Sequence, residues 1–291
     1  MWGLNTLEWI SKSNILIVGL GLMGGSYAKA LKRLGYHISA IDKNSESIQY
    51  ALNEKIIDEG STDIDTNIIS SADAVIFALY PNVFKDWIFD NQKYFKPGVL
   101  ITDVTGVKSC IVYDIQNILR EDAEFIAAHP MAGREVYGVK NSDDGIFRGA
   151  NYIVTPTEKN TDPGIEWCKT LGRILGFSKI SVLSPEEHDK IIGFVSQLTH
   201  VIAVSLMTCN DNTDLVSYTG DSFRDLTRIA RINENMWSEL FLLNKDVLLE
   251  QMDNFINEFE IIRNMLNCND KEGLCDKMRL STRRRSYFDK K

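Results

Sequence analysis

The chain has 291 residues, of which 44% are hydrophobic and 25% are charged, and its formal net charge is −8. These values are typical of a globular protein of one or two domains. The negative charge argues against a nucleic-acid partner, because contacts to phosphates need a basic surface. The five cysteines include no Cys-x-x-Cys pair, so we expect neither a disulfide framework nor a metal site, and a reducing, cytoplasmic location.

No uninterrupted apolar run reaches the roughly 18 residues that a membrane-spanning helix needs. The N-terminus also lacks a charged region followed by an apolar segment and a small-residue cleavage site, which a signal peptide would have. We therefore expect no membrane partner.

Short aliphatic runs alternate with amphipathic stretches over the first 180 residues. This alternation predicts βαβ units and a doubly wound, mostly parallel sheet of the Rossmann type. The later connections are less regular, so we expect extra strands at one edge of that sheet. The predicted strands span residues 15–18, 37–41, 74–79, 99–103, 124–128, 152–155 and 180–183.

The pattern changes at Ser184. Ser184, Pro185 and Glu187 form a helix start with a capping box, and no strand pattern recurs from there to about residue 265. We predict a dinucleotide-binding domain over residues 1–183 and an all-helical domain for substrate binding and dimerisation over residues 184–291. The apolar stretches at 191–207 and 236–249 are long for a small domain, which predicts a homodimer.

A glycine-rich turn follows the first predicted strand. Its G-x-G-x-x-G motif predicts a dinucleotide site, because the strand before it and the helix after it supply the required context. The first glycine permits the tight turn, the second lets the backbone approach the pyrophosphate, and the third allows close packing of helix and strand. The helix N-terminus offers free N–H groups to the phosphates. The predicted cofactor-binding residues in this turn are Gly19, Gly21, Leu22, Met23 and Gly24.

An acidic residue ends the next predicted strand. Asp42 lies 18 residues beyond Gly24, where a carboxylate that binds both ribose hydroxyls is expected. That carboxylate would repel a 2′-phosphate, so NAD is favoured over NADP. Lys43 is the argument for the alternative, because a cation there could meet a 2′-phosphate.

Three further motifs lie downstream. His129-Pro130-Met131-Ala132-Gly133 follows a predicted strand, and a histidine at that edge suits acid–base chemistry. Residues 195–200 read Val-Ser-Gln-Leu-Thr-His, and residues 223–230 read Phe-Arg-Asp-Leu-Thr-Arg-Ile-Ala. Together with the glycine-rich turn, these motifs resemble the prephenate dehydrogenase family, which includes arogenate dehydrogenases, over about residues 15–249.

The resemblance implies a reaction and a set of residues. The family uses NAD to decarboxylate prephenate oxidatively to 4-hydroxyphenylpyruvate in tyrosine biosynthesis. His129 matches the histidine that binds the substrate hydroxyl and takes its proton, and Arg228 matches an arginine that binds a carboxylate, for which a guanidinium fork is suited. The remaining matches are acidic residues that pair with such an arginine and residues of the substrate pocket, namely Glu135, Asp225, Ser196, His200 and Trp237.

Several of these assignments have structural alternatives. His200 and Trp237 could be core residues, and Ser196 could bond the carbonyl four residues before it. His188 and Asp189 follow the predicted helix start, and we assign them no role. Where the family often has a serine near its catalytic histidine, this chain has Gly106, so Thr105, Ser109 or a water would have to replace that hydroxyl.

Three competing functions stay open. An arogenate dehydrogenase would take a substrate with an amino group in place of the keto group. A reductase of a small imine or 3-hydroxy acid would need a catalytic lysine in the helical part. Lys190 and Lys245 are the only candidates in its main helices, and neither sits in a matching motif. A dinucleotide sensor without catalysis would not need His129 and Arg228.

Overall fold

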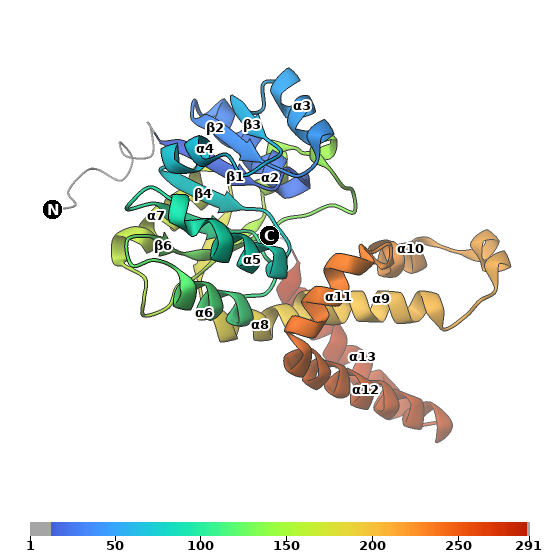
Figure 1. Ribbon diagram of the computed structural model, residues 1–291. Coiled ribbons are helices and arrows are strands. Elements are labelled where there is room, and N and C mark those ends of the chain that lie inside the picture. Colours follow the sequence, from blue (N-terminus) through green and yellow to red (C-terminus); the bar gives the residue numbers. More distant parts are fainter. Residues whose placement is uncertain (1–12, 290–291) are drawn as a thin grey trace. The chain divides into compact units, whose positions relative to one another are not determined.

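The structure is a computed structural model that describes residues 13–289 (Figure 1). The expectation about a signal peptide concerns the first residues and lies outside this range. The described chain forms two compact units, one that ends at Asn244 and one from Lys245 onward.

The first unit is built on a six-stranded parallel sheet. Its strand order, β3-β2-β1-β4-β5-β6, is that of a doubly wound dinucleotide-binding fold, which confirms the predicted class. Each strand that the sequence predicted begins within one residue of the expected position. Across the sheet, the strands are β3 (Glu59–Ser61), β2 (His37–Ile41), β1 (Asn14–Val18), β4 (Ala74–Phe77), β5 (Leu100–Asp103) and β6 (Glu124–Phe125).

Helices cover both faces of this sheet (Figure 1). Alternate residues of β1 enter different cores: Ile15 and Ile17 join one apolar cluster, whereas Leu16 and Val18 join the other. Such two-sided burial is why the strands read as continuous apolar runs. The helices are α2 (Leu22–Arg33), α3 (Ser45–Asn53), α4 (Thr66–Ser71), α5 (Pro81–Asn91), α6 (Ser109–Ile118) and α7 (Asp162–Ile174), with short turns η1 (Gln92–Tyr94), η2 (Val139–Asn141) and η3 (Asp144–Phe147).

The expectation of extra strands at one sheet edge is wrong. The later strands form a separate sheet in which β8 (Asn151–Thr155) pairs antiparallel with β7 (Ala127–Met131) and parallel with β9 (Lys179–Val182). The predicted strand 124–128 is therefore two strands, because β6 pairs with β5 while β7 leaves for the second sheet. His129 thus lies on β7 of the second sheet, although the neighbouring Ala128 still donates its backbone N–H to Asp103 at the end of β5.

A long helix follows the second sheet. It begins with the predicted capping box at Ser184 and runs through α8 (Pro185–Ile192), a π-helical segment η4 (Gly193–Leu198) and α9 (Thr199–Thr208). The remaining elements of the first unit are η5 (Thr213–Tyr218), α10 (Asp221–Thr227), η6 (Arg228–Ala230) and α11 (Glu234–Leu243). The part of the chain after Ser184 is thus helical as predicted.

This helix bears on the expectation about membrane spans. By length and composition alone, the 24 residues Pro185–Thr208 could cross a membrane, with a mean hydropathy of 1.7 over the most apolar window. The sequence count overlooked it because single polar residues such as Ser196 interrupt the apolar run without lowering its mean much. About a quarter of that window, 28%, is buried within the structure.

The second unit is a helical hairpin of α12 (Lys245–Asn267) and α13 (Lys271–Arg285), followed by η7 (Ser286–Phe288). Lys277 on α13 donates to Glu258 on α12 at 2.6 Å. Phe259, Leu266 and Met278 are exposed on this hairpin. The hairpin thus presents apolar surface. The domain boundary at Ser184 stays a prediction.

Candidate active site

The glycine turn joins β1 to α2, and two of its glycines are required by close contacts. Gly19 has a φ of +97°, which side chains disfavour. A Cβ on Gly24 would lie 1.9 Å from the carbonyl oxygen of Gly19. Around Gly21, by contrast, a Cβ would meet nothing within 4 Å. Gly21 therefore borders open space that a ligand can approach.

Asp42 lies beside this turn. Its Oδ2 accepts the backbone N–H of Leu20 at 2.5 Å, and its Oδ1 accepts that of Asn44 at 2.8 Å. The carboxylate is thus fixed against the glycine turn while part of it stays accessible. The neighbouring Lys43 is exposed. Met23, the remaining member of the turn, packs against the core cluster that contains Ile15.

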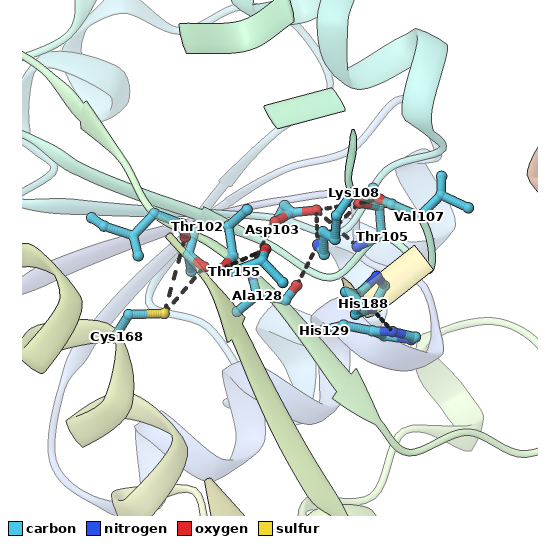
Figure 2. Close-up of polar contacts among 12 residues, drawn as sticks. Thr102, Asp103, Thr105, Val107, Lys108, Ala128, His129, Thr155, Cys168 and His188 are labelled. Atoms are coloured by element: carbon cyan, nitrogen blue, oxygen red, sulfur yellow. Dashed lines mark hydrogen bonds and ion pairs between the residues drawn. The ribbon is translucent and has the colours of Figure 1, made fainter. Parts of the chain in front are cut away.

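His129 lies on β7, opposite Ile153 of β8, and is half-buried. Its Nδ1 is 2.8 Å from Nε2 of His188 on α8, as Figure 2 shows. Burial lowers the pKa of His129 well below its ordinary value, and the neighbouring His188 and Lys108 lower it further. His129 is therefore a neutral imidazole near neutral pH.

His188 is tied in turn to Asp189. Nδ1 of His188 lies 2.8 Å from Oδ1 of Asp189, and the side chain of His188 is fully buried. The carboxylate of Asp189 also accepts the backbone N–H groups of Lys108 and Ser109, each at 2.8 Å, at the start of α6. The sequence analysis mentioned His188 and Asp189 without assigning them a role, and the structure places both behind His129.

A buried ion pair fixes the backbone next to His129. Nζ of Lys108 donates to Asp103 at 2.7 Å, to the carbonyl oxygen of Ala128 at 2.6 Å and to the hydroxyl of Thr105 at 3.2 Å. Oδ1 of Asp103 accepts the backbone N–H of Ala128 at 3.1 Å. Both polar groups of Ala128 are thus held by this pair (Figure 2). Asp103 and Lys108 lie within five positions of one another on either side of Gly106, so their closeness could have been expected from the sequence.

Gly106 lies next to His129. A Cβ at this position would be 3.9 Å from Cε1 of His129 and 3.5 Å from the side chain of Leu240. Of the two hydroxyls considered as replacements for the family's serine, that of Thr105 is used by Asp103 and the carbonyl oxygen of Val107. The protein side chain that hydrogen-bonds His129 is instead His188.

The predicted pocket residues of the helical part lie on α9 and α11. His200 stacks on Trp237, with ring centroids 3.7 Å apart and an interplanar angle of 29°. Nδ1 of His200 donates to the carbonyl oxygen of Ser196 at 2.9 Å, so Ser196 contributes its backbone to this bond. Burial lowers the pKa of His200, and the Ser196 carbonyl opposes that effect.

α11 links these residues to His129. Trp237 contacts His200, and Leu240, one turn further along α11, contacts the space at Gly106 beside His129. The carbonyl oxygen of Leu240 also accepts the side-chain amide of Gln197 at 3.0 Å. The histidine site on β7 and the pocket residues on α9 are therefore parts of one neighbourhood.

Arg228 lies at the start of η6 and forms an ion pair with Glu135, as predicted. Its side chain is 64% exposed, so the guanidinium can exchange this partner for another anion. The charge of Glu135 raises the pKa of His200 and that of Arg228 lowers it, both less than burial does. Asp225 is exposed on α10, and the recorded ion pair of Arg228 is to Glu135 rather than to Asp225.

Two family models match the chain. Residues 27–177 match the nucleotide-binding domain of prephenate dehydrogenase, and residues 184–280 match its dimerization domain. The chain belongs to the prephenate dehydrogenase family. This confirms the resemblance found in the sequence motifs.

Several members of the prephenate dehydrogenase family are about 30% identical to this chain. The chain is 31% identical to a prephenate dehydrogenase of Bacillus subtilis, over 90% of this chain and 72% of that protein. It is 27% identical to a cyclohexadienyl dehydrogenase of Zymomonas mobilis, over 94% of each. A crystal structure of prephenate dehydrogenase from Aquifex aeolicus, in complex with hydroxyphenyl propionate and NAD+, superposes with a TM-score of 0.88 at 32% identity, covering 95% of this chain and 98% of that one.

Proposed function

We propose that this protein is an NAD-dependent prephenate dehydrogenase. The observation that carries the proposal is the half-buried His129, whose pKa is lowered by burial and which is hydrogen-bonded to His188 next to the space at Gly106. A neutral imidazole in that place suits the proton chemistry of a substrate hydroxyl. The similarity to the Aquifex aeolicus enzyme with NAD+ and a hydroxyphenyl ligand supports the same assignment.

The glycine turn fits a dinucleotide. A Cβ at Gly24 would collide with Gly19, the space at Gly21 is open, and α2 presents its N-terminus there. Asp42 supports NAD over NADP, because its carboxylate would repel a 2′-phosphate. When bound, NAD supplies the acceptor for the hydride that leaves the substrate ring.

His129 and Arg228 divide the work on the substrate. His129 accepts the hydrogen bond of the ring hydroxyl and takes up its proton as the carbonyl-like centre forms. Loss of the hydride and of carbon dioxide leaves a phenol, so the same oxygen regains that proton and His129 acts without net proton release. Arg228 binds a carboxylate of the substrate in exchange for Glu135, while His200 and Trp237 border the pocket.

Arogenate dehydrogenase is the second candidate. The observation in its favour is the 24% identity, over 89% of this chain, to a probable arogenate/prephenate dehydrogenase of Methanocaldococcus jannaschii. The two substrates differ only in the keto or amino group of the side chain, so the residues named above serve either one.

One assay set distinguishes these functions. Prephenate and arogenate are each supplied with NAD and with NADP, and reduction of the cofactor is followed by its near-ultraviolet absorbance. We expect the highest kcat/KM with prephenate and NAD. A preference for arogenate would select the second candidate, and no turnover with any pair would contradict both.

We also propose that the helical part, from Ser184 onward, forms a homodimer. The support is the family model of a dimerization domain and the exposed apolar side chains of Phe194, Val195 and Phe259. Light scattering should give about twice the chain mass of 33.0 kDa at micromolar concentration. A mass of one chain would contradict this proposal.

The cytoplasmic location stays a prediction.

A further inference from the structure

Asp189 is held in a state in which it can only accept hydrogen bonds. The backbone N–H of Lys108 donates to its Oδ1 and that of Ser109 to its Oδ2, each at 2.8 Å. Backbone N–H groups are obligatory donors, so both oxygens act as acceptors. Burial raises the pKa of Asp189, but the bonds from His188 and Ser109 outweigh it, and the pKa lies below its ordinary value. The partial positive charge at the N-terminus of α6 stabilises the same anion.

This acceptor determines which nitrogen of His188 carries the proton. Oδ1 of Asp189 has no proton to give, so Nδ1 of His188, 2.8 Å away, must donate. Burial lowers the pKa of His188 and Asp189 offsets this only in part, so the resting ring is neutral. A neutral imidazole with a proton on Nδ1 has an acceptor on Nε2.

The same reasoning extends to His129. Nε2 of His188 is the acceptor and lies 2.8 Å from Nδ1 of His129, so Nδ1 of His129 must donate. The lone pair of a neutral His129 then resides on Nε2. Among the described residues, the one buried side-chain polar atom without a partner is the hydroxyl of Tyr27. Nε2 of His129 makes no hydrogen bond within the described residues and is not fully buried, so it remains accessible to a ligand.

We propose that Asp189 and His188 are positioning residues that fix the tautomer of His129 with Nδ1 protonated and Nε2 free. This inference rests on the proposed function, in which His129 takes the proton of the substrate hydroxyl. The other tautomer would present an N–H at Nε2, which can donate to the hydroxyl oxygen but cannot take its proton. The charged groups that face Asp189, His188 and His129 are Lys108 and Asp103, which form an ion pair with each other.

Nitrogen NMR on the ligand-free protein tests the tautomer directly. The chain has four histidines, so single substitutions assign every ring in a long-range proton–nitrogen correlation spectrum. We expect His129 to show a protonated Nδ1 and an unprotonated Nε2. In Asp189→Asn the side-chain amide can donate to Nδ1 of His188, and the direction of both hydrogen bonds can then reverse. The proton of His129 should therefore be shared between its two ring nitrogens or move to Nε2. A neutral His129 with its proton on Nε2 in the unaltered protein would overturn the proposal.

The control for these spectra is His37→Gln. His37 lies at the exposed start of β2, and its substitution should remove one ring from the spectrum without changing the others. Because no substrate is present, this experiment can fail while the dehydrogenase assay succeeds, and the two proposals are judged separately.

Kinetics of two substitutions at His188 provide the second test. His188→Leu removes the acceptor for Nδ1 of His129, whereas His188→Gln can turn its amide oxygen toward it. We expect kcat to fall on the order of 10²-fold in His188→Leu, with at least about tenfold recovered in His188→Gln. The KM for NAD should stay within about threefold in both, since a positioning role acts on the chemical step.

Two kinetic outcomes would overturn the tautomer proposal. One is a kcat of His188→Leu equal to that of the unaltered protein, and the other is a kcat of His188→Gln no higher than that of His188→Leu. If His188→Leu does not fold, the spectrum of the unaltered protein still decides the question.

Discussion

Lys108 and Asp103 form an ion pair in which both side chains are 0% exposed, and the pair bonds both backbone polar groups of Ala128, the residue before His129. Removing one partner of a buried pair leaves an uncompensated charge, at a cost of about 3–5 kcal/mol. Lys108→Met should therefore lower the free energy of unfolding by about that amount, measured by urea denaturation. Lys85→Met is the matched control, because Lys85 pairs with Asp114 at the surface and should change stability by less than about 1 kcal/mol. An equal decrease in the free energy of unfolding for the two variants would contradict the claim that burial makes the Lys108–Asp103 pair matter more than a surface pair.

Replacement of His129 by asparagine tests its place in the chemistry. His129→Asn removes the proton acceptor, so kcat should fall by roughly 10²- to 10⁴-fold. Calorimetry should find the affinity for NAD unchanged, because the glycine turn lies on a different strand–helix unit. Turnover within a few-fold of the unaltered protein would exclude His129 as the base.

The pH dependence of kcat/KM follows from the direction of the His129 pKa. Protonation removes the acceptor, and burial holds this pKa well below the ordinary histidine value of about 6.5. Activity should therefore persist as the pH falls through about 6.5 and decline only at lower pH. An unperturbed histidine would place the decline at about pH 6.5 itself, and the burial of His129 moves it to lower pH. A decline in kcat/KM that begins above pH 6.5 or so would contradict a lowered pKa of His129.

Arg228 should govern substrate affinity. The guanidinium of Arg228 is exposed and already paired with Glu135. Arg228→Ala should therefore weaken prephenate binding by about 2 kcal/mol, the lower end of the range for charge pairs, which corresponds to a roughly 30-fold rise in KM. Arg228→Lys should recover only part of this, because a point charge does not reproduce the planar fork. Arg224→Ala is the control, since Arg224 is exposed on the neighbouring α10 and pairs with Asp221. If Arg224→Ala raises the KM equally, general charge rather than the position of Arg228 determines affinity.

Two glycines of the turn should respond differently to alanine. A methyl group on Gly21 meets open space, so Gly21→Ala should keep the melting temperature while weakening NAD binding by at least about tenfold, since about 1.4 kcal/mol of lost contact suffices. A methyl group on Gly24 would collide with the backbone of Gly19, so Gly24→Ala should lower the melting temperature as well. Calorimetric titration and thermal unfolding separate the two effects. Unchanged NAD affinity in Gly21→Ala would place the cofactor elsewhere.

The features that the sequence predicted well are local ones. The capping box at Ser184 and the glycine turn each depend on residues within a few positions of one another, and both occur as expected. The split of residues 124–128 between two sheets was missed, because β6 and β7 are distinguished only by their distant partners, β5 and β8.

The support behind His129 was missed for the same reason. Asp189 meets the start of α6 across about 80 positions of sequence, with Lys108 and Asp189 separated by 81. No periodicity or spacing reports such a contact. His188 therefore read as a polar residue near a helix start, although it lies between His129 and Asp189 in space.

The π-helical segment η4 sets the phase between two parts of one helix. His188 lies before it on α8 and His200 after it on α9, within one continuous helix. Each residue of an α-helix advances the side-chain direction by about 100°, whereas the wider i→i+5 turns of a π-helix take up an additional residue locally. Deleting one residue within Gly193–Leu198 should therefore convert the segment to regular helix and leave both His188 and His200 facing their present partners. The additional residue in η4 is thus the one change in length that the spacing between residues 188 and 200 should tolerate.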